Sequence, residues 1–188
     1  MLRKIALAGA LSLGLSSAAL AQTHTDTAGT IIPGVSAGQI KEACVTPTVT
    51  TANAYGTNYV VGGLLTFALA LPPSGGGSIQ SVYVQTNTVE SNGFTFTPFS
   101  AQPSASTWTD AAVAAITGAD KKLARGAISL AASSALGTYS TISSVGIGQV
   151  INAGATTLYG VLTSNGALSS NFTTTGDVTV CIDVLQFP

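Results

Sequence analysis

The sequence contains few residues that could form a catalytic or metal centre. It has one histidine, His24, and two cysteines, Cys44 and Cys181. Zinc and copper sites need several His, Cys or carboxylate ligands at characteristic spacings. We therefore predict neither a metal site nor a cofactor. An even number of cysteines in an exported chain favours one disulfide bond, Cys44–Cys181. The alternative is two buried free thiols.

One stretch, Gly34–Gly38, matches the G-x-S-x-G string of serine hydrolases. In those enzymes the serine lies in a sharp strand-to-helix turn, and the acid and the histidine follow it in the chain. Here the stretch lies in a polar N-terminal segment, and His24 precedes it. We interpret the match as chance.

Two acidic residues, Asp110 and Asp120, are candidates for the paired carboxylates of a glycoside hydrolase. Such carboxylates face each other across a cleft at ~5–10 Å. Both residues lie beside short helix-like stretches, Asp110–Ile116 and Ala119–Arg125, where acidic residues commonly serve as caps. Thr109 or Asp110 would cap the first stretch. We favour the capping or surface interpretation, and we predict that the chain is not an enzyme.

The main cationic cluster consists of Lys121, Lys122 and Arg125, and the single tryptophan is Trp108. These four residues form a candidate contact patch for an anion or a neighbouring subunit. The alternative for the cations is an ordinary solvated helix face. The alternative for Trp108 is a packing anchor beneath the helical insertion.

The first residues have the three parts of a signal peptide. Arg3 and Lys4 give a positive start, Ile5–Leu20 is apolar, and a small-x-small pattern ends at Ala21. Cleavage would leave Gln22 as the first residue. The alternative is a membrane anchor, but the run is short for a span. We therefore expect export to the periplasm, the cell surface or the medium, with no membrane span after cleavage.

The composition narrows the class of partner. Charged residues make up 7% of the chain, against about 25% in typical soluble domains. Six Lys or Arg oppose seven Asp or Glu, and two of the six lie in the leader. So few cations cannot neutralise a phosphate backbone, and we predict no nucleic-acid partner. A surface of hydroxyls and small apolar groups is poorly protected against association, so we expect a homo-oligomer or a structural protein lattice.

Most of the remaining sequence is typical of short strands that are separated by Gly- and Asn-containing turns. In the last of these strands the apolar residues from Val178 to Val184 share one face. Seven to nine strands without a long amphipathic helix predict an all-β, antiparallel β-sandwich of jelly-roll type, with a short helical insertion around residues 109–125. The expected strands are Tyr59–Leu71, Ser78–Thr88, Phe94–Phe99, Gly126–Ala132, Thr138–Val145, Gln149–Ile151, Thr156–Ser164 and Asp177–Leu185.

The predicted organisation has three parts. Residues 1–21 are the signal peptide, residues 22–43 an extended arm, and residues 44–188 a single sandwich domain. Residues 72–77 are expected to form a loop. If the segment that follows Cys44 runs beside the last strand, the disulfide would join the start of the domain to its end.

Several segments together carry a resemblance to a known group of proteins. They are Asn53–Tyr55, Val61–Phe67, Gly75–Val82, Pro103–Asp110, Ala119–Lys122, Leu158–Leu162 and Leu185–Gln186. This order resembles poorly characterised structural, capsid-decorating proteins of tailed phages and prophages, and it covers Val49–Gln186. The resemblance implies a virion-surface or capsid-decorating role with no catalytic residues. The signal peptide departs from the pattern, because virion proteins assemble in the cytoplasm. Either a phage-type domain has been recruited for export, or the sequences are alike because both form β-sandwiches.

Two functions therefore remain open. The first is a structural subunit or decoration protein of a particle, filament or cell-surface assembly. The second is an exported module that binds glycans or another surface ligand, for which exposed aromatic residues aligned on one sheet would be the sign. The candidates for that platform are Tyr55, Tyr59, Tyr83, Trp108, Tyr139 and Tyr159.

Overall fold

A computed structural model describes residues 38–52, 54–131, 134–168 and 171–187 of the chain. The predicted signal peptide, its cleavage site between Ala21 and Gln22, and residues 22–37 of the predicted arm lie outside the described residues. His24 and most of the G-x-S-x-G match lie outside them too.

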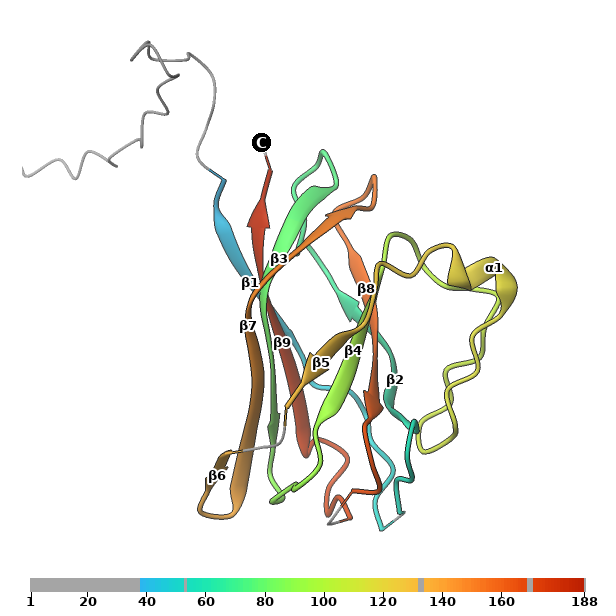
Figure 1. The fold of residues 1–188 in the computed structure, drawn as a ribbon, viewed down its shortest axis with the longest axis vertical. Helices are drawn as coiled ribbons and strands as arrows, with labels where there is room; N and C mark the ends of the chain where they lie inside the picture. The colour runs from blue at the N-terminus through green and yellow to red at the C-terminus, as the bar shows by residue number, and fades with distance from the viewer. Residues whose placement is uncertain (1–37, 53, 132–133, 169–170, 188) are drawn as a thin grey trace, which may run out of the picture. The chain divides into compact units, whose positions relative to one another are not determined.

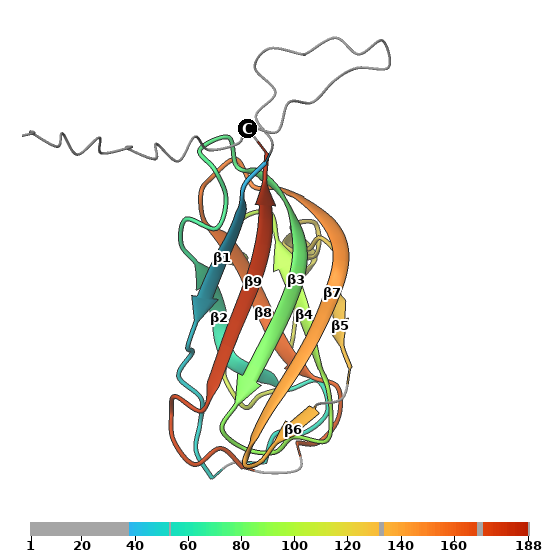
Figure 2. The same ribbon diagram turned by 90° about the vertical axis from the view of Figure 1, so that its left-hand side faces the viewer.

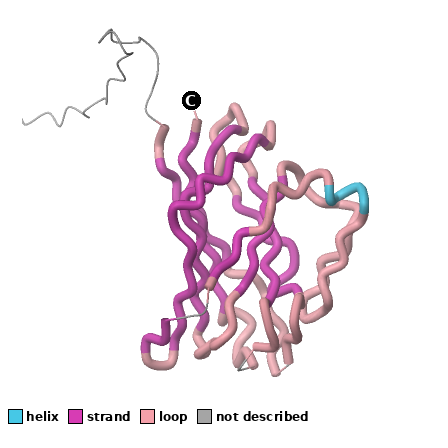
Figure 3. The backbone as a smooth tube through the Cα atoms, viewed as in Figure 1, coloured by secondary structure: helices cyan, strands magenta, loops and turns pink. Residues whose placement is uncertain are grey.

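Two antiparallel sheets form the domain, and this confirms the predicted all-β sandwich (Figures 1 and 3). The first sheet has the order β1-β9-β3-β7-β6, and the second has the order β2-β8-β4-β5. The strands of the first sheet are β1 (Ile40–Val45), β9 (Val178–Gln186), β3 (Gly76–Thr86), β7 (Tyr139–Asn152) and β6 (Ser134–Leu136). Those of the second are β2 (Val60–Phe67), β8 (Leu158–Ser164), β4 (Phe94–Phe99) and β5 (Ile128–Leu130).

The strand pairing has the topology of a jelly roll. β1 pairs with β9, β2 with β8, β3 with β7 and β4 with β5. The chain therefore pairs as one long hairpin, and its successive pairs alternate between the two sheets. This is the double-sheet arrangement of jelly-roll proteins.

The core lies between the inner faces of the two sheets. The predicted alternation of β9 is confirmed, because Val178, Val180, Ile182 and Val184 are all fully buried. Phenylalanines from the second sheet face them, and Phe67 and Phe96 meet edge to face with ring centroids 5.9 Å apart. Burial of these side chains is the main force that holds the sheets together.

Several strand boundaries differ from the prediction, and in three places a strand extends beyond it. β1 begins at Ile40, inside the predicted arm, and β3 begins at Gly76, inside the predicted loop. β7 runs unbroken from Tyr139 to Asn152, although Gly146 and Gly148 predict that the strand is interrupted there. In each case a partner strand far away in the sequence supplies the hydrogen bonds. Local composition cannot show such a partner.

The helical insertion is smaller than predicted. Among the described residues, the insertion contains one helical turn, α1 (Gly118–Lys121). The predicted helical stretch Asp110–Ile116 is not helical, so neither Thr109 nor Asp110 caps a helix there. This segment instead pairs with the start of β2 through a bridge between Tyr59 and Val113. No helix among the described residues is long and apolar enough to cross a membrane.

Candidate functional site

Residues 100–127, which connect β4 to β5, cross the outer face of the second sheet, and we call this segment the strap (Figure 1). Backbone hydrogen bonds fasten it at two places. Ala111 N–H donates to Val60 at 2.9 Å, and Ala114 N–H donates to Asn58 at 2.9 Å. On the other side Arg125 N–H donates to the carbonyl of Pro98 at 2.9 Å. The strap is therefore bound to the two edges of the face that it covers.

Asp110 ties the strap to the sandwich. Its carboxylate accepts hydrogen bonds from the N–H of Thr50, the N–H of Gly62 and the hydroxyl of Tyr55, each at 2.6 Å. Tyr55 is buried, and this burial, together with its hydrogen bond to Asp110 and the negative charge there, raises the pKa of the Tyr55 hydroxyl. Asp110 therefore has a structural anchoring role, which the sequence did not reveal.

The N–H of Gly62 is available to Asp110 because β2 bulges. Two residues, Gly62 and Gly63, have no partner on β8, and both have φ of 76°. A Cβ atom on Gly62 would overlap the ring of Pro47. Only glycine accommodates both the positive φ and this close approach.

Beneath the strap lies a second, smaller hydrophobic cluster on the outer face of the sheet. Val60, Phe99 and Val161 are buried there, although the sheet's other face forms the main core. Trp108 is half-buried against Phe99, with ring centroids 5.6 Å apart. Its indole N–H donates to the carbonyl of Pro103 at 3.2 Å. This position agrees with the packing interpretation of Trp108.

A pocket of about 310 Å³ opens between the strap and the sheet. The strap contributes an indole ring and three aliphatic side chains, and the sheet contributes both polar and apolar side chains. The lining residues are Asn58, Thr97, Phe99, Trp108, Val113, Ala114, Ile116, Val161 and Thr163. No ionisable side chain lines the described pocket, so its interior is electrically neutral.

The four residues of the candidate contact patch do not have the same exposure. Lys121, Lys122 and Arg125 are exposed on the strap. Trp108 is half-buried and lines the pocket. A ligand in the pocket would contact Trp108 without touching the three cations, which do not line it.

The two candidate catalytic carboxylates have different environments. Both oxygens of Asp110 accept hydrogen bonds. Asp120, in α1, is only 2% exposed, and its Oδ2 has no hydrogen-bond partner among the described residues. Among the described residues, no hydrogen bond therefore links the two carboxylates.

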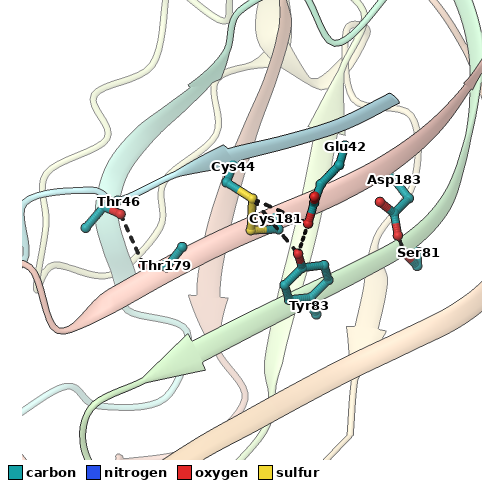
Figure 4. Close-up of a disulfide and its surroundings, with 8 residues drawn as sticks. All are labelled: Glu42, Cys44, Thr46, Ser81, Tyr83, Thr179, Cys181 and Asp183. Atoms are coloured by element: carbon teal, nitrogen blue, oxygen red, sulfur yellow. Dashed lines mark hydrogen bonds between the residues drawn. A yellow bond between two sulfur atoms is a disulfide. The ribbon is translucent and has the colours of Figure 1, made fainter. Parts of the chain in front are cut away.

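The predicted disulfide bond joins Cys44 of β1 to Cys181 of β9 (Figure 4). The two residues are direct neighbours in the register, and their Cα atoms are 4.1 Å apart. The end of the predicted arm is therefore docked as a strand, and the start of the domain is fixed to its end. The side chains of Cys44 and Cys181 lie on the outer face of the first sheet.

Polar side chains surround this bond (Figure 4). The hydroxyl of Tyr83 donates to Glu42, and that of Ser81 donates to Asp183. The hydrogen bond to Glu42, partial burial and the charges of Glu42 and Asp183 raise the pKa of Tyr83 to about 12. Glu42, Cys44 and Cys181 place possible metal-ligand atoms within 4.8 Å of one another. Both sulfurs belong to the disulfide, so the group offers only one carboxylate as a ligand.

The six aromatic residues predicted as a glycan platform do not line up on one sheet. Tyr55 is buried in the main core. Tyr83 lies on the outer face of the first sheet, whereas Trp108 and Tyr159 belong to the cluster beneath the strap. Tyr139, at the start of β7, is 56% exposed. Tyr59 is half-buried against the main core. These positions do not form a flat aromatic platform.

Comparison of the sequence with models of protein families finds no match, and comparison with curated proteins finds none either.

Proposed function

We propose that the chain is a non-enzymatic structural protein that is exported and associates with copies of itself, as a subunit or decoration protein of a particle, filament or cell-surface assembly. The phage-type resemblance of Val49–Gln186 supports a decorating role. The disulfide bond supports a location outside the cytoplasm, where such bonds persist. The low charge supports contact between copies, because like-charge repulsion between them is weak.

The observation that carries this proposal is an apolar patch on the outer face of the first sheet. One register row places Ile40, Leu185, Ser78 and Val150 side by side across β1, β9, β3 and β7, the strands that face the viewer in Figure 2. Ile40 is 68% exposed and Val150 is 58% exposed. Phe187 adds its ring at the end of the sheet, where it lies over Gly76. Ser78, which is buried, separates Val150 from Leu185 and Ile40 in this row. Exposed apolar side chains gathered on one face mark protein contact sites.

The edges of the sheets are poor alternatives for this association. β1 carries Lys41 and Glu42, the start of β2 is hydrogen-bonded to the strap, and β5 and β6 have three residues each. β7, beyond the residues that pair with β6, bulges at residues 146–148 opposite Gln80. Charged residues, short strands and bulges are the devices that keep sheet edges from pairing. We therefore assign the contact to the face, and we assign a second copy of the chain as its occupant. The patch row itself has no charged side chain, and a face of this kind can meet its own copy across a two-fold axis.

The mass of the mature protein in solution tests the proposal. Light scattering during size-exclusion chromatography should give a dimer or a larger homo-oligomer. The variants Ile40→Lys and Val150→Lys should give monomers, because a lysine would be buried without a partner. Val113→Lys, which changes a 60% exposed valine on the strap, should behave as the unaltered protein does. A monomer at high concentration, or loss of association in the Val113 control, would contradict the proposal.

A second candidate function is an exported binding module. The pocket beneath the strap favours it, because the pocket combines an indole ring with polar side chains. The two functions are compatible, since the patch and the pocket lie on different sheets.

A further inference from the structure

The pocket beneath the strap has an apolar part and a polar part. Trp108, Phe99, Ile116 and Val161 belong to the apolar part, and the polar part comes from Asn58, Thr97 and Thr163. The pocket's volume of about 310 Å³ lies at the lower end of the range for small-molecule sites. Because no charged side chain lines the described pocket, a charged ligand would lose its hydration without finding a counter-ion there.

Two of the polar side chains have unused hydrogen-bonding capacity. Among the described residues, neither the amide of Asn58 nor the hydroxyl of Thr97 makes a hydrogen bond to protein. Thr163, by contrast, donates to the carbonyl of Thr95 at 3.4 Å. The amide of Asn58 can both donate and accept, and so can the hydroxyl of Thr97. They therefore match a ligand that carries hydroxyl groups.

Hydrogen bonds hold the main chain at both residues. Asn58 N–H donates to Ser164 at 2.8 Å, and the carbonyl of Asn58 accepts from Ala114 at 2.9 Å. Thr97 lies within β4, opposite Val161 of β8. A site whose main chain is already held in place loses little backbone freedom when a ligand binds.

Trp108 supplies the apolar side. The indole is held by its hydrogen bond to Pro103 and by its contact with Phe99. Its N–H is used within the protein, so its contribution to a ligand is apolar contact by the ring. A sugar ring has C–H groups on its faces and hydroxyl groups around its rim. It can therefore contact an aromatic surface and bond to nearby amide and hydroxyl groups at the same time.

We propose that this pocket binds a neutral, hydroxylated ring, such as the terminal sugar of a glycan. Trp108 contacts the face of the ring, and Asn58 and Thr97 bond to its hydroxyl groups. The exposed Lys121, Lys122 and Arg125 take no part, because they do not line the pocket. The inference is independent of whether the chain associates with itself.

The lone tryptophan makes the test direct. Because Trp108 is the single tryptophan of the chain, its fluorescence reports on the pocket in the mature, oxidised protein. Titration with neutral monosaccharides, such as glucose, galactose, mannose and N-acetylglucosamine, should give a saturable change with at least one of them. The same titration with glucuronate should bind at least tenfold more weakly than with the corresponding neutral sugar.

Three variants distinguish binding in the pocket from other effects. Thr97→Val keeps the shape and removes the hydroxyl, and it should weaken binding about three- to tenfold. Ala114→Leu should fill the pocket and abolish binding. Tyr139→Ala changes the most exposed of the candidate aromatic residues and lies outside the pocket, so it should bind as the unaltered protein does. Urea unfolding of each variant would establish that it folds.

Several outcomes would overturn the inference. They are no saturable change with any neutral sugar, equal binding by the folded Ala114→Leu variant, and tighter binding of glucuronate. Binding of apolar probes such as indole without binding of any sugar would also overturn it.

Discussion

The carboxylate of Asp110 accepts a hydrogen bond from the N–H of Gly62 at 2.6 Å, across 48 positions of the sequence. The same carboxylate binds Thr50 and Tyr55. One acidic side chain thus joins the strap, the bulge of β2 and the segment that follows β1. The pocket beneath the strap depends on this junction, because the junction sets where the strap crosses the sheet.

Replacement of Asp110 by alanine should therefore loosen the strap. We expect the free energy of unfolding to fall by about 2–4 kcal/mol, because three donors lose a charged acceptor. Urea denaturation measures this, and the fluorescence of Trp108 should shift to the red in the folded variant. Thr109→Ala, which changes the exposed neighbouring residue, should cost no more than about 0.5 kcal/mol. Equal effects of the two substitutions would contradict the anchoring role.

The capping interpretation of Asp110 failed for a physical reason. An acidic residue before an Ala-containing stretch is a local signal, and it is typical of helix starts. The three donors that hold Asp110 lie 48, 55 and 60 positions earlier in the chain. Only the folded sandwich brings them together, so no spacing in the sequence could reveal the anchor.

The disulfide bond should contribute strongly to stability. The bond closes a loop between residues 137 positions apart, for which loop entropy gives about 5 kcal/mol at most. Urea denaturation with and without dithiothreitol should show a lower midpoint in the reduced protein. The double variant Cys44→Ala/Cys181→Ala should unfold near the reduced midpoint and should not respond to the reductant. Two free thiols, detected by mass spectrometry in the protein purified without reductant, would contradict the bond.

Gly160 is required for the position of Phe96. A Cβ atom on Gly160 would overlap the ring of Phe96, which packs against Phe67 in the main core. Gly160→Ala should therefore destabilise the protein by about 1–3 kcal/mol in thermal or urea unfolding, as overpacking commonly does. At Gly118 a Cβ atom would meet nothing within 4 Å. Gly118→Ala should be neutral or stabilise by up to about 1 kcal/mol, and a cost equal to that at Gly160 would refute the steric argument.

Tyr83 should make the protein sensitive to strongly alkaline pH. Its pKa is raised from 10.0 to about 12, so the folded state keeps the proton after the unfolded state has lost it. This contribution to stability is complete below pH 10.0 and is lost as the pH rises toward the folded value. The melting temperature should fall less steeply over this interval in Tyr83→Phe. Tyr55 contributes in the same direction in both proteins. Identical pH profiles would exclude the role of Tyr83.

Asp177 should have the opposite effect at acid pH. Its burial acts to raise its pKa, but hydrogen bonds from the hydroxyl and N–H groups of Thr174 and Thr173 outweigh this and hold the pKa well below the usual 3.8. This stability is present above pH 3.8 and is lost as the pH falls toward the lowered value. Asp177→Asn should be less stable at neutral pH and should lose less stability on acidification. Thermal unfolding between neutral and strongly acid pH checks this, and parallel curves would contradict it.

The features that the sequence predicted well are local or had few alternatives. Alternation from Val178 to Val184 is visible within one strand, and it placed that face in the core. Two cysteines in the predicted domain allow one pairing, and the structure forms it. The start of β1 was missed because half of its first four residues, Ile-Lys-Glu-Ala, are charged and they follow a polar segment. It is a strand because β9 lies beside it, and β9 comes more than a hundred residues later.

The nested pairing of strands also has a consequence for the rate of folding. β4 and β5 are the innermost pair of this nest, while β1 and β9 are the first and last strands of the described domain. Pairs that are distant in sequence must lose loop entropy before their contacts compensate for it, and all-β domains of this type commonly fold in milliseconds to seconds. The ends are the most separated partners, so the sheet that contains both cysteines is expected to close last. Oxidation of Cys44 and Cys181 would then follow the pairing of β1 with β9, and a newly made chain would become resistant to unfolding only at that final step.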